Sequence, residues 1–188
     1  GIVVAKFYET GRKITPPNLD FEGTIYTFTE GNEYVMVIEG NGEMGQLMEI
    51  SGINITAGYG WQYESALFMA GYAENCTLPY VSESIICDGV KNIGLYALGG
   101  DTSLKKLTIS KDVTSIGDFA IALCSSLTNV TIPDSVTSIG KCAFEFCSSL
   151  TNVTIGNSVT SIGSSAFEEC SGLTNVIIPD GVTSIEGY

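Results

Sequence analysis

Hydrophobic residues recur every 23 positions in the second half of the chain, and polar residues fill the places between them. Residues 127–149 and 150–172 are nearly identical copies of this pattern. A unit of this length cannot bury its own apolar side, so successive units must stack and share a continuous core. We therefore predict a solenoid. Its best-matched copies begin at Leu104, Leu127, Leu150 and Leu173.

Each copy begins with the pattern of a short strand. Val130, Thr131 and Ile132 are all β-branched, which favours a strand that buries Val130 and Ile132 and turns Thr131 outward. The Pro-Asp-Ser that follows has the composition of a turn. After this turn, Val136 and Ile139 are expected to face inward.

The last third of each copy favours a short helical or 3-10 segment. Ala143, Phe144 and Cys147 are spaced i, i+1 and i+4, which places them on one face of a helix. We expect this face to pack on the core. Each copy is therefore predicted to contain one short strand and one short convex segment, the arrangement of an α/β solenoid.

The array is predicted to cover residues 81–188, because residues 58–80 do not fit the 23-residue frame. Residues 1–80 are predicted to form a small β-rich cap, since the first copy has an unpaired edge that must be covered. Within the array we assign copies to residues 81–103, 104–126, 127–149 and 150–172, with a partial copy at 173–188.

The cap is predicted to contain a β-hairpin at residues 23–39. Two alternating β-rich runs flank Gly31-Asn32, a two-residue turn signal. Residues 63–75 are predicted to form a helix between the cap and the array.

In the last copy, Ile185 is followed only by Glu186, Gly187 and Tyr188, and the alanine-phenylalanine segment is missing. Either the natural protein ends on an open edge, or the chain was cut from a longer array. An open solenoid end invites pairing with another chain. We therefore expect weak self-association through residues 173–188.

The formal net charge of −13 is distributed along the whole chain. Such a charge repels a phosphate backbone and an anionic membrane surface, so nucleic acid and membrane are not expected partners. No apolar run is long enough to cross a bilayer.

Histidine is absent from the sequence. This removes the usual general base, the common nucleophile pairs and imidazole metal ligands. No phosphate-binding loop is present, and we expect neither a cofactor nor a metal. Paired carboxylates can hydrolyse glycans, but we interpret the acids here as solvated residues of turns and of the convex side. These acids are Asp112, Asp134, Glu168, Glu169 and Asp180.

The chain has six cysteines, of which Cys124, Cys147 and Cys170 are 23 residues apart and therefore fall in one column. Stacking at about 4.8 Å brings column neighbours within range of a disulfide. Their side chains would point in parallel, however, so we favour buried free thiols that act as small hydrophobic groups.

Four Asn-x-Thr triplets fit the glycosylation acceptor pattern, at Asn54, Asn75, Asn129 and Asn152. The last two come from the repeat itself. They are equally consistent with a ladder of asparagine and threonine side chains on the strand face.

The repeat "LTNVTIPDSVTSIGKCAFEFCSS" resembles the BspA-like leucine-rich repeats of bacterial and protist cell-surface proteins. The segment Val37–Met44, "VIEGNGEM", is similar to one that often precedes those repeats. The resemblance implies a right-handed leucine-rich-repeat superhelix and a non-enzymatic, extracellular module for adhesion or protein binding. Its partner would be an extracellular protein or glycoprotein, and its targeting signal and anchor would lie outside this chain.

The candidate binding surface is the strand face, which we expect to be concave. Two alternatives to a binding module remain open: a structural spacer with no ligand of its own, and a carbohydrate hydrolase. The candidate binding residues are Lys105, Lys106, Thr108, Thr128, Asn129, Thr131, Thr151, Asn152, Thr154 and Asn175.

Overall fold

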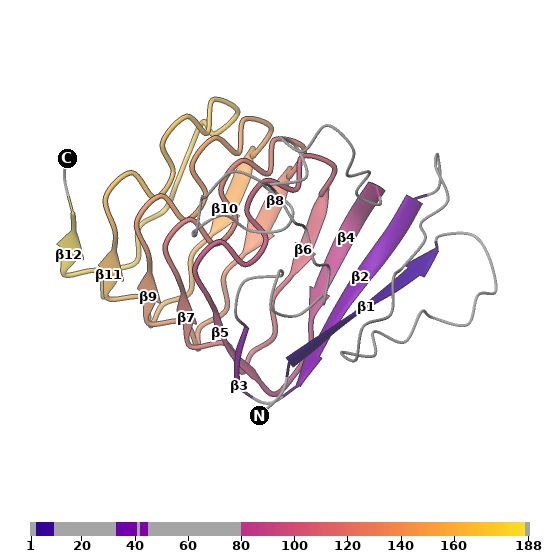
Figure 1. Ribbon diagram of the computed structural model, residues 1–188. Coiled ribbons are helices and arrows are strands. Elements are labelled where there is room, and N and C mark those ends of the chain that lie inside the picture. The colour runs from indigo at the N-terminus through magenta and orange to yellow at the C-terminus, as the bar shows by residue number, and fades with distance from the viewer. Residues whose placement is uncertain (1–2, 10–32, 41, 45–79, 187–188) are drawn as a thin grey trace, which may run out of the picture.

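The fold is a solenoid whose coils stack in a row, as seen in a computed structural model (Figure 1). The structure describes residues 3–9, 33–40, 42–44 and 80–186, with side chains from residue 81 onward. Each coil between residues 80 and 172 contributes one strand to each of two sheets and then makes a run of turns before the next coil, and the last described coil contributes one strand only. The 23-residue spacing is confirmed by the strand register, which pairs Asn152 with Asn129 and Ser161 with Ser138.

The strands form two six-stranded sheets. Sheet A has the order β1-β2-β4-β6-β8-β10 and sheet B the order β12-β11-β9-β7-β5-β3. Sheet A contains β1 (Val3–Glu9), β2 (Glu33–Gly40), β4 (Tyr80–Ile86), β6 (Lys106–Thr108), β8 (Asn129–Thr131) and β10 (Asn152–Thr154). Sheet B contains β3 (Gly42–Met44), β5 (Val90–Ile93), β7 (Ser115–Ile116), β9 (Ser138–Ile139), β11 (Ser161–Ile162) and β12 (Ser184–Ile185).

The core lies between the two sheets and is built from columns of equivalent side chains. In β8 the middle residue, Val130, is buried while the residues on either side are exposed. Val136, Ile139 and Phe144 are at most 2% exposed, as the inward assignment predicted. Each coil therefore buries its apolar side against its neighbours, which is why the pattern must repeat.

The last third of each copy, which we call the turn segment (residues 140–149 in the coil of β8 and β9), contains no helix in the described part of the chain. This corrects the predicted helical or 3-10 segment. Two residues four positions apart in each turn segment have left-handed backbone, such as Cys142 (φ 52°) and Phe146 (φ 58°), and these interrupt any helical run. The physical reason is spacing: strands of neighbouring coils lie about 4.8 Å apart, whereas a helix with its side chains is about 10 Å wide.

Residues 33–40 and 42–44 extend the two sheets on the N-terminal side of the array. β2 pairs in parallel with β4, and β3 pairs in parallel with β5. β1 then pairs antiparallel with the other edge of β2. The predicted hairpin partner of β2, at residues 23–30, lies outside the described residues, as does the predicted helix at 63–75. Among the described strands, β2 lies between β1 and β4.

Candidate functional site

The candidate residues lie on the outer face of sheet A. All ten are exposed. The parallel register places Asn129 beside Asn152 and Thr131 beside Thr154, and it pairs Lys106 with Asn129. Asn175 is exposed but lies outside any strand. The structure therefore brings nine of the ten onto three neighbouring strands and the residues that directly precede them.

Asparagine and threonine side chains form a hydrogen-bonded ladder across this face. Asn152 Nδ2 donates to Asn129 Oδ1 at 2.8 Å and to Thr151 Oγ1 at 3.1 Å. Asn129 Nδ2 donates to Thr128 Oγ1 at 3.0 Å, and Thr151 Oγ1 donates to the carbonyl oxygen of Thr128 at 3.0 Å. The ladder interpretation of Asn129 and Asn152 is confirmed. These bonds hold the exposed polar groups in fixed positions before any partner arrives.

Sheet B carries a second threonine ladder. Thr137 Oγ1 donates to the carbonyl oxygen of Thr114 at 3.2 Å, and Thr160 Oγ1 donates to that of Thr137 at 3.1 Å. Thr114 and Thr183 make the same bond to the coil before them. Threonine thus joins coils on both sheets, so a threonine ladder alone does not distinguish a binding face from a stacking device. Asparagine pairing is the feature that the two sheets do not share in the described residues.

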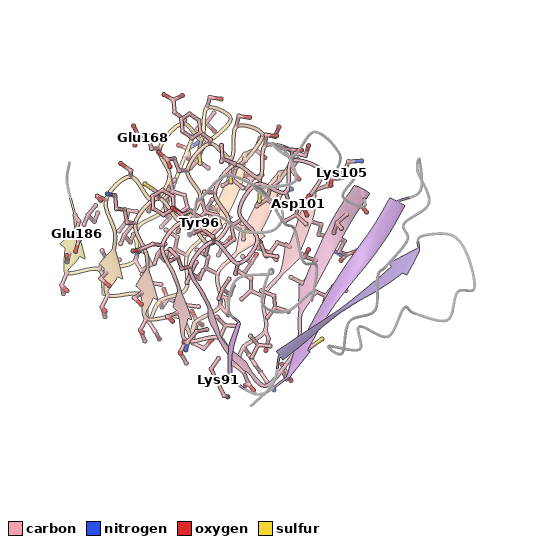
Figure 2. The ribbon with its side chains drawn as sticks, in the orientation of Figure 1. Lys91, Tyr96, Asp101, Lys105, Glu168 and Glu186 are labelled. Carbon is pink, nitrogen blue, oxygen red and sulfur yellow. The ribbon has the colours of Figure 1, made fainter. Side chains whose placement is uncertain are left out.

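The positive charge that Lys105 and Lys106 bring to this face is partly neutralised. Lys106 Nζ forms an ion pair with Glu83, whose strand β4 lies directly beside β6. Sequence reasoning missed Glu83, although it stands 23 residues before Lys106 and so falls in the same column. In Figure 2, Lys105 lies near sheet A and Lys91, which is on β5 of sheet B, lies at the opposite side of the molecule.

Of the predicted acids, Asp134, Glu169 and Asp180 are exposed, whereas Asp112 and Glu168 are partly buried. Asp134 Oδ1 accepts a hydrogen bond from the backbone N–H of Asn157 at 2.7 Å. Asp112 Oδ2 accepts one from the N–H of Gly89 at 3.0 Å, and this bond lowers the pKa of Asp112. Both carboxylates therefore satisfy donors of a neighbouring coil. No group of three or more potential metal ligands occurs among the described residues.

The cysteine column is a set of buried free thiols, as expected. Cys124, Cys147 and Cys170 each donate to a carbonyl oxygen 26 residues earlier, at 3.3, 3.2 and 3.1 Å. The adjacent thiol of Cys147, followed by burial, raises the pKa of Cys124, and burial raises that of Cys170 to about 12. Because the thiolate is the reactive form, Cys124 and Cys170 are poor nucleophiles at neutral pH.

Asp101 occupies the cysteine position of the first complete described copy, 23 residues before Cys124. Its side chain is 3% exposed, and Oδ2 has no hydrogen-bond partner in the described part of the chain. Ser103 Oγ lies 2.8 Å from Oδ1, and the Ser103 N–H donates to Oδ1 at 3.2 Å. Burial raises the pKa of Asp101 to about 6, against the smaller lowering effect of hydrogen bonds from Ser103 and Leu104.

This carboxyl group predicts an unusual pH dependence of stability. Its folded-state pKa lies above the ordinary 3.8, so between about pH 4 and pH 6 the folded chain keeps a proton that the unfolded chain releases. The contribution of Asp101 to the free energy of unfolding is therefore most favourable below pH 4 and is lost as the pH rises through 6. We expect Asp101→Asn to be more stable than the parent at pH 7, by about 1–3 kcal/mol, and equally stable near pH 3.5.

Urea unfolding of both proteins from pH 3.5 to pH 7.5 measures this difference. A constant difference across that range would contradict the assignment to Asp101. Taking the difference between variant and parent cancels the titration of other carboxylates, including Asp112, whose lowered pKa acts in the opposite direction.

A family model of the BspA type leucine rich repeat region matches residues 73–188 in six copies. No curated protein matches the chain at a significant level. The part of the chain that the structure describes holds no helix long and apolar enough to span a bilayer.

Three solved structures are similar. The leucine-rich repeat protein TpLRR of T. pallidum shares 28% identity over 56% of this chain and 56% of its own, with a TM-score of 0.52. The pneumococcal vaccine antigen PcpA shares 26% identity over 59% of this chain and 28% of its own, with a TM-score of 0.50. A leucine-rich cell surface protein of Faecalibacterium prausnitzii shares 26% identity over 87% of this chain and 51% of its own, with a TM-score of 0.43. The chain thus spans about half or less of these relatives.

Proposed function

This chain belongs to the BspA-type leucine-rich repeat family, and from that premise we propose that it is a non-enzymatic binding or adhesion module of the cell surface. Its partner is an extracellular protein or glycoprotein that docks on sheet A. The observation that carries the proposal is the exposed asparagine–threonine ladder across β8 and β10. We also propose that the chain is divided into an N-terminal cap at residues 1–80 and the repeat array at residues 81–188.

The ladder suits an extended partner. Within the described residues, the ladder leaves one amide proton of Asn129 and the Oδ1 atom of Asn152 for an outside group. These two groups lie on neighbouring strands, about 4.8 Å apart, so they form a row across the face that an extended partner can follow. Because the side chains are already held by each other, little side-chain entropy is lost on binding.

The extracellular location is supported by the likeness to PcpA, which is described as a vaccine antigen. The absence of enzymatic activity is supported by the lack of histidine in the sequence and by the raised pKa values of the buried thiols. Two of the acids that could serve a glycan hydrolase, Asp112 and Asp134, instead accept hydrogen bonds from backbone N–H groups of neighbouring coils. A glycan turnover screen tests that activity directly.

A second candidate function is a structural spacer. It is favoured by the threonine ladder of sheet B, which joins coils in the same way as the ladder of sheet A. A spacer would hold another part of a longer protein away from the surface and would have no ligand of its own.

Paired variants distinguish the two functions. A panel of extracellular matrix proteins and glycoproteins is first screened for binding to the parent chain. We expect the double variant Asn129→Ala with Asn152→Ala to bind the captured partner at least about tenfold more weakly than the parent does. The same loss is expected for Lys105→Glu with Lys106→Glu, because removing central contacts weakens other interfaces to this extent. The melting temperature should change little, because exposed polar pairs contribute roughly 1 kcal/mol or less.

The matched control lies on sheet B. Thr137→Val with Thr160→Val removes the same type of bond that Thr128→Val with Thr151→Val removes on sheet A. The sheet A pair should weaken binding and the sheet B pair should leave it unchanged. Equal effects from both pairs, or a panel without any captured partner, would support the spacer.

A further inference from the structure

Val81, the second residue of β4, is held differently from its equivalents in the later copies. In those copies the backbone N–H at this position donates to the carbonyl oxygen three residues earlier, at 2.9 to 3.2 Å. The equivalent positions are Leu104, Leu127, Leu150 and Leu173. The N–H of Val81 instead donates to Ser103 Oγ of the following coil, at 3.0 Å. A side chain therefore makes at Val81 the bond that the backbone makes in the later copies.

Ser103 contacts both backbone groups of Val81, because its Oγ atom also lies 3.1 Å from the Val81 carbonyl oxygen. The pairing of β4 with β2 is irregular at this point. Tyr34 pairs with Val81, but the next residue of β2, Val35, pairs with Glu83. Such a register shift interrupts the ladder locally. The serine thus fastens β4 to the following coil at the place where its pairing with β2 is interrupted.

Asp101 competes with Val81 for the proton of this serine. Its Oδ1 atom lies 2.8 Å from Ser103 Oγ and accepts a hydrogen bond from the Ser103 N–H at 3.2 Å. Its Oδ2 atom is buried and has no hydrogen-bond partner among the described residues. A serine hydroxyl has one proton to donate and two lone pairs with which to accept. Ser103 therefore cannot donate to the carboxylate and to the Val81 carbonyl oxygen at the same time.

The two protonation states of Asp101 divide these bonds differently. When the carboxyl group is ionised, the Ser103 hydroxyl donates to Oδ1, because a charged acceptor makes the stronger bond, and its bond to the Val81 carbonyl oxygen is lost. When the carboxyl group is neutral, its own O–H donates from Oδ1 to Ser103 Oγ. The serine proton is then available for the Val81 carbonyl oxygen. Only the neutral state satisfies all of these contacts together.

We propose that Asp101 and Ser103 form a proton-dependent clasp on Val81, which fastens β4 to the next coil when the carboxyl group is neutral and loosens it when the group is ionised. The contacts of the clasp are special to this coil. In the later copies a cysteine takes the position of Asp101. Ser126 is the equivalent of Ser103, and it makes no bond to Leu104, the equivalent of Val81, in the described part of the chain. The clasp is independent of the function proposed for sheet A.

The pKa of Asp101 sets the pH at which the clasp changes state, and burial raises this pKa to about 6. The other titratable groups of the described residues around it keep their charge state in this range. In the next turn segment the pKa of Cys124 is raised well above its ordinary value, first by an adjacent thiol, so Cys124 stays neutral. On β4 and β6, Glu83 and Lys106 form an ion pair with each other, and Lys105 is exposed. Asp101 is therefore the group whose titration works the clasp.

Carbon-13 NMR of the whole chain follows both ends of the clasp. The carboxyl carbon of Asp101 and the carbonyl carbon of Val81 should titrate together, with a midpoint at the pKa of Asp101, about 6. After correction for the intrinsic exchange rate, the protection of the Val81 amide against hydrogen exchange should fall about fivefold between about pH 4.5 and about pH 7.5, since one hydrogen bond is lost. A Val81 carbonyl signal that stays constant while Asp101 titrates would overturn the proposal.

A matched pair of serine variants tests the link between the two ends. Ser103→Ala removes the shared hydroxyl, so Asp101 should still titrate while the Val81 carbonyl carbon no longer follows it. The Val81 amide of this variant should exchange at least about fivefold faster than that of the parent at about pH 4.5. Ser126→Ala removes the hydroxyl at the equivalent position of the next coil and should behave as the parent does. Loss of the coupling in both variants, or in neither, would refute the clasp.

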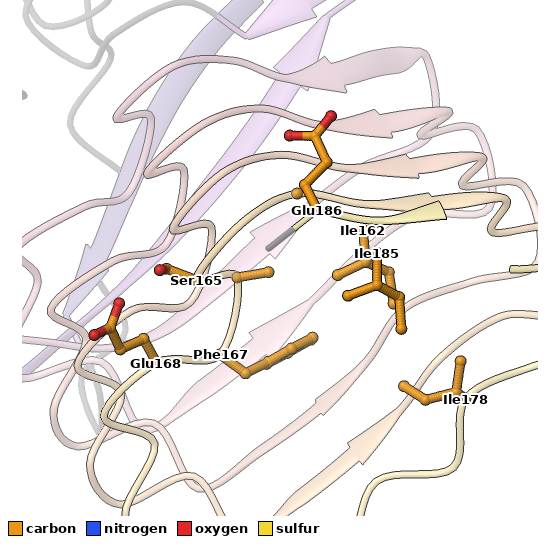
Figure 3. Close-up of a pocket in the computed structure, with 9 residues that line it drawn as sticks. Ile162, Ser165, Phe167, Glu168, Ile178, Ile185 and Glu186 are labelled. Atoms are coloured by element: carbon orange, nitrogen blue, oxygen red, sulfur yellow. The ribbon is translucent and has the colours of Figure 1, made fainter. Parts of the chain in front are cut away.

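A second pair of variants tests the titrating group. Asp101→Asn keeps the position uncharged, so the Val81 carbonyl signal should not change with pH, and the Val81 amide should keep at about pH 7.5 the protection that the parent has at about pH 4.5. Glu168→Gln makes the same chemical change in the turn segment that follows β11, where Glu168 lines an apolar groove (Figure 3). This control should leave the titration of Val81 unchanged. A Val81 titration that persists in Asp101→Asn would show that another group drives it and would overturn the proposal.

Discussion

Replacing Phe144 with alanine is expected to lower the free energy of unfolding by about 3–5 kcal/mol. Phe144 is fully buried in the middle of the array, and its ring stacks on Phe167 at 5.2 Å. The side chain is surrounded by neighbouring coils that are tied to each other by backbone hydrogen bonds, including the bond from the Phe144 N–H to the carbonyl oxygen of Ala166 at 2.8 Å. These bonds keep the coils from closing over the cavity, so both the lost burial and the cavity contribute to the loss.

Urea unfolding followed by circular dichroism measures this loss. The control is Phe146→Ala, two residues away in the same turn segment, where the side chain is 45% exposed. Both variants keep the backbone N–H bonds to the next coil, so they differ mainly in burial. We expect the control to lose less than about 1 kcal/mol. A Phe144→Ala protein as stable as the Phe146→Ala protein would contradict the core assignment.

The inward residues of each copy were predictable because period and hydrophobicity both report burial. The spacing and hydrophobicity of Val136, Ile139, Phe144 and Cys147 predict that they face the core, and all four are buried. The prediction of a helix in the turn segment was wrong, and the sequence of a single copy does not reveal why. Whether Ala143 and Phe144 join a helix depends on how closely the next coil approaches, which is a property of the stack.

The location of the exposed face of sheet A was predictable from the sequence. Its hydrogen bonds and ion pair were predictable only in part. Alternation of β-branched and polar residues placed Asn129 and Thr131 outside, and the 23-residue column suggested the ladder. The ion pair of Lys106 with Glu83 required the register between β4 and β6, which a weakly matching first copy obscures. Aligning that copy in the 23-residue frame identifies Glu83, because Glu83 falls at the same position of the repeat as Lys106.

The glycines that begin the turn segments show how the close approach of coils is achieved. A β-carbon built on Gly140 would lie 2.5 Å from the carbonyl carbon of Gly117 and 2.6 Å from the backbone nitrogen of Asp118. Gly163 approaches Gly140 and Lys141 in the same way, one coil later. These neighbours are backbone atoms, and the Asp118 side chain is itself held by the N–H of Lys141 at 2.8 Å. The glycine column therefore lets sheet B and the turn segments keep strand-like spacing.

We expect Gly140→Ala to lower the free energy of unfolding by more than about 3 kcal/mol, at the upper end of the cost of overpacking, because no flexible side chain can yield to the new methyl group. Forcing two coils apart weakens their shared interface, so the array should also unfold in a broader transition, as expected when nearest-neighbour coupling falls. Thermal and urea unfolding measure both effects. Gly181→Ala is the control, since a β-carbon there would lie 3.2 Å from its nearest neighbour, the carbonyl oxygen of Asn157. A Gly140→Ala protein that unfolds as sharply and as late as Gly181→Ala would show that the coils are not stacked this closely.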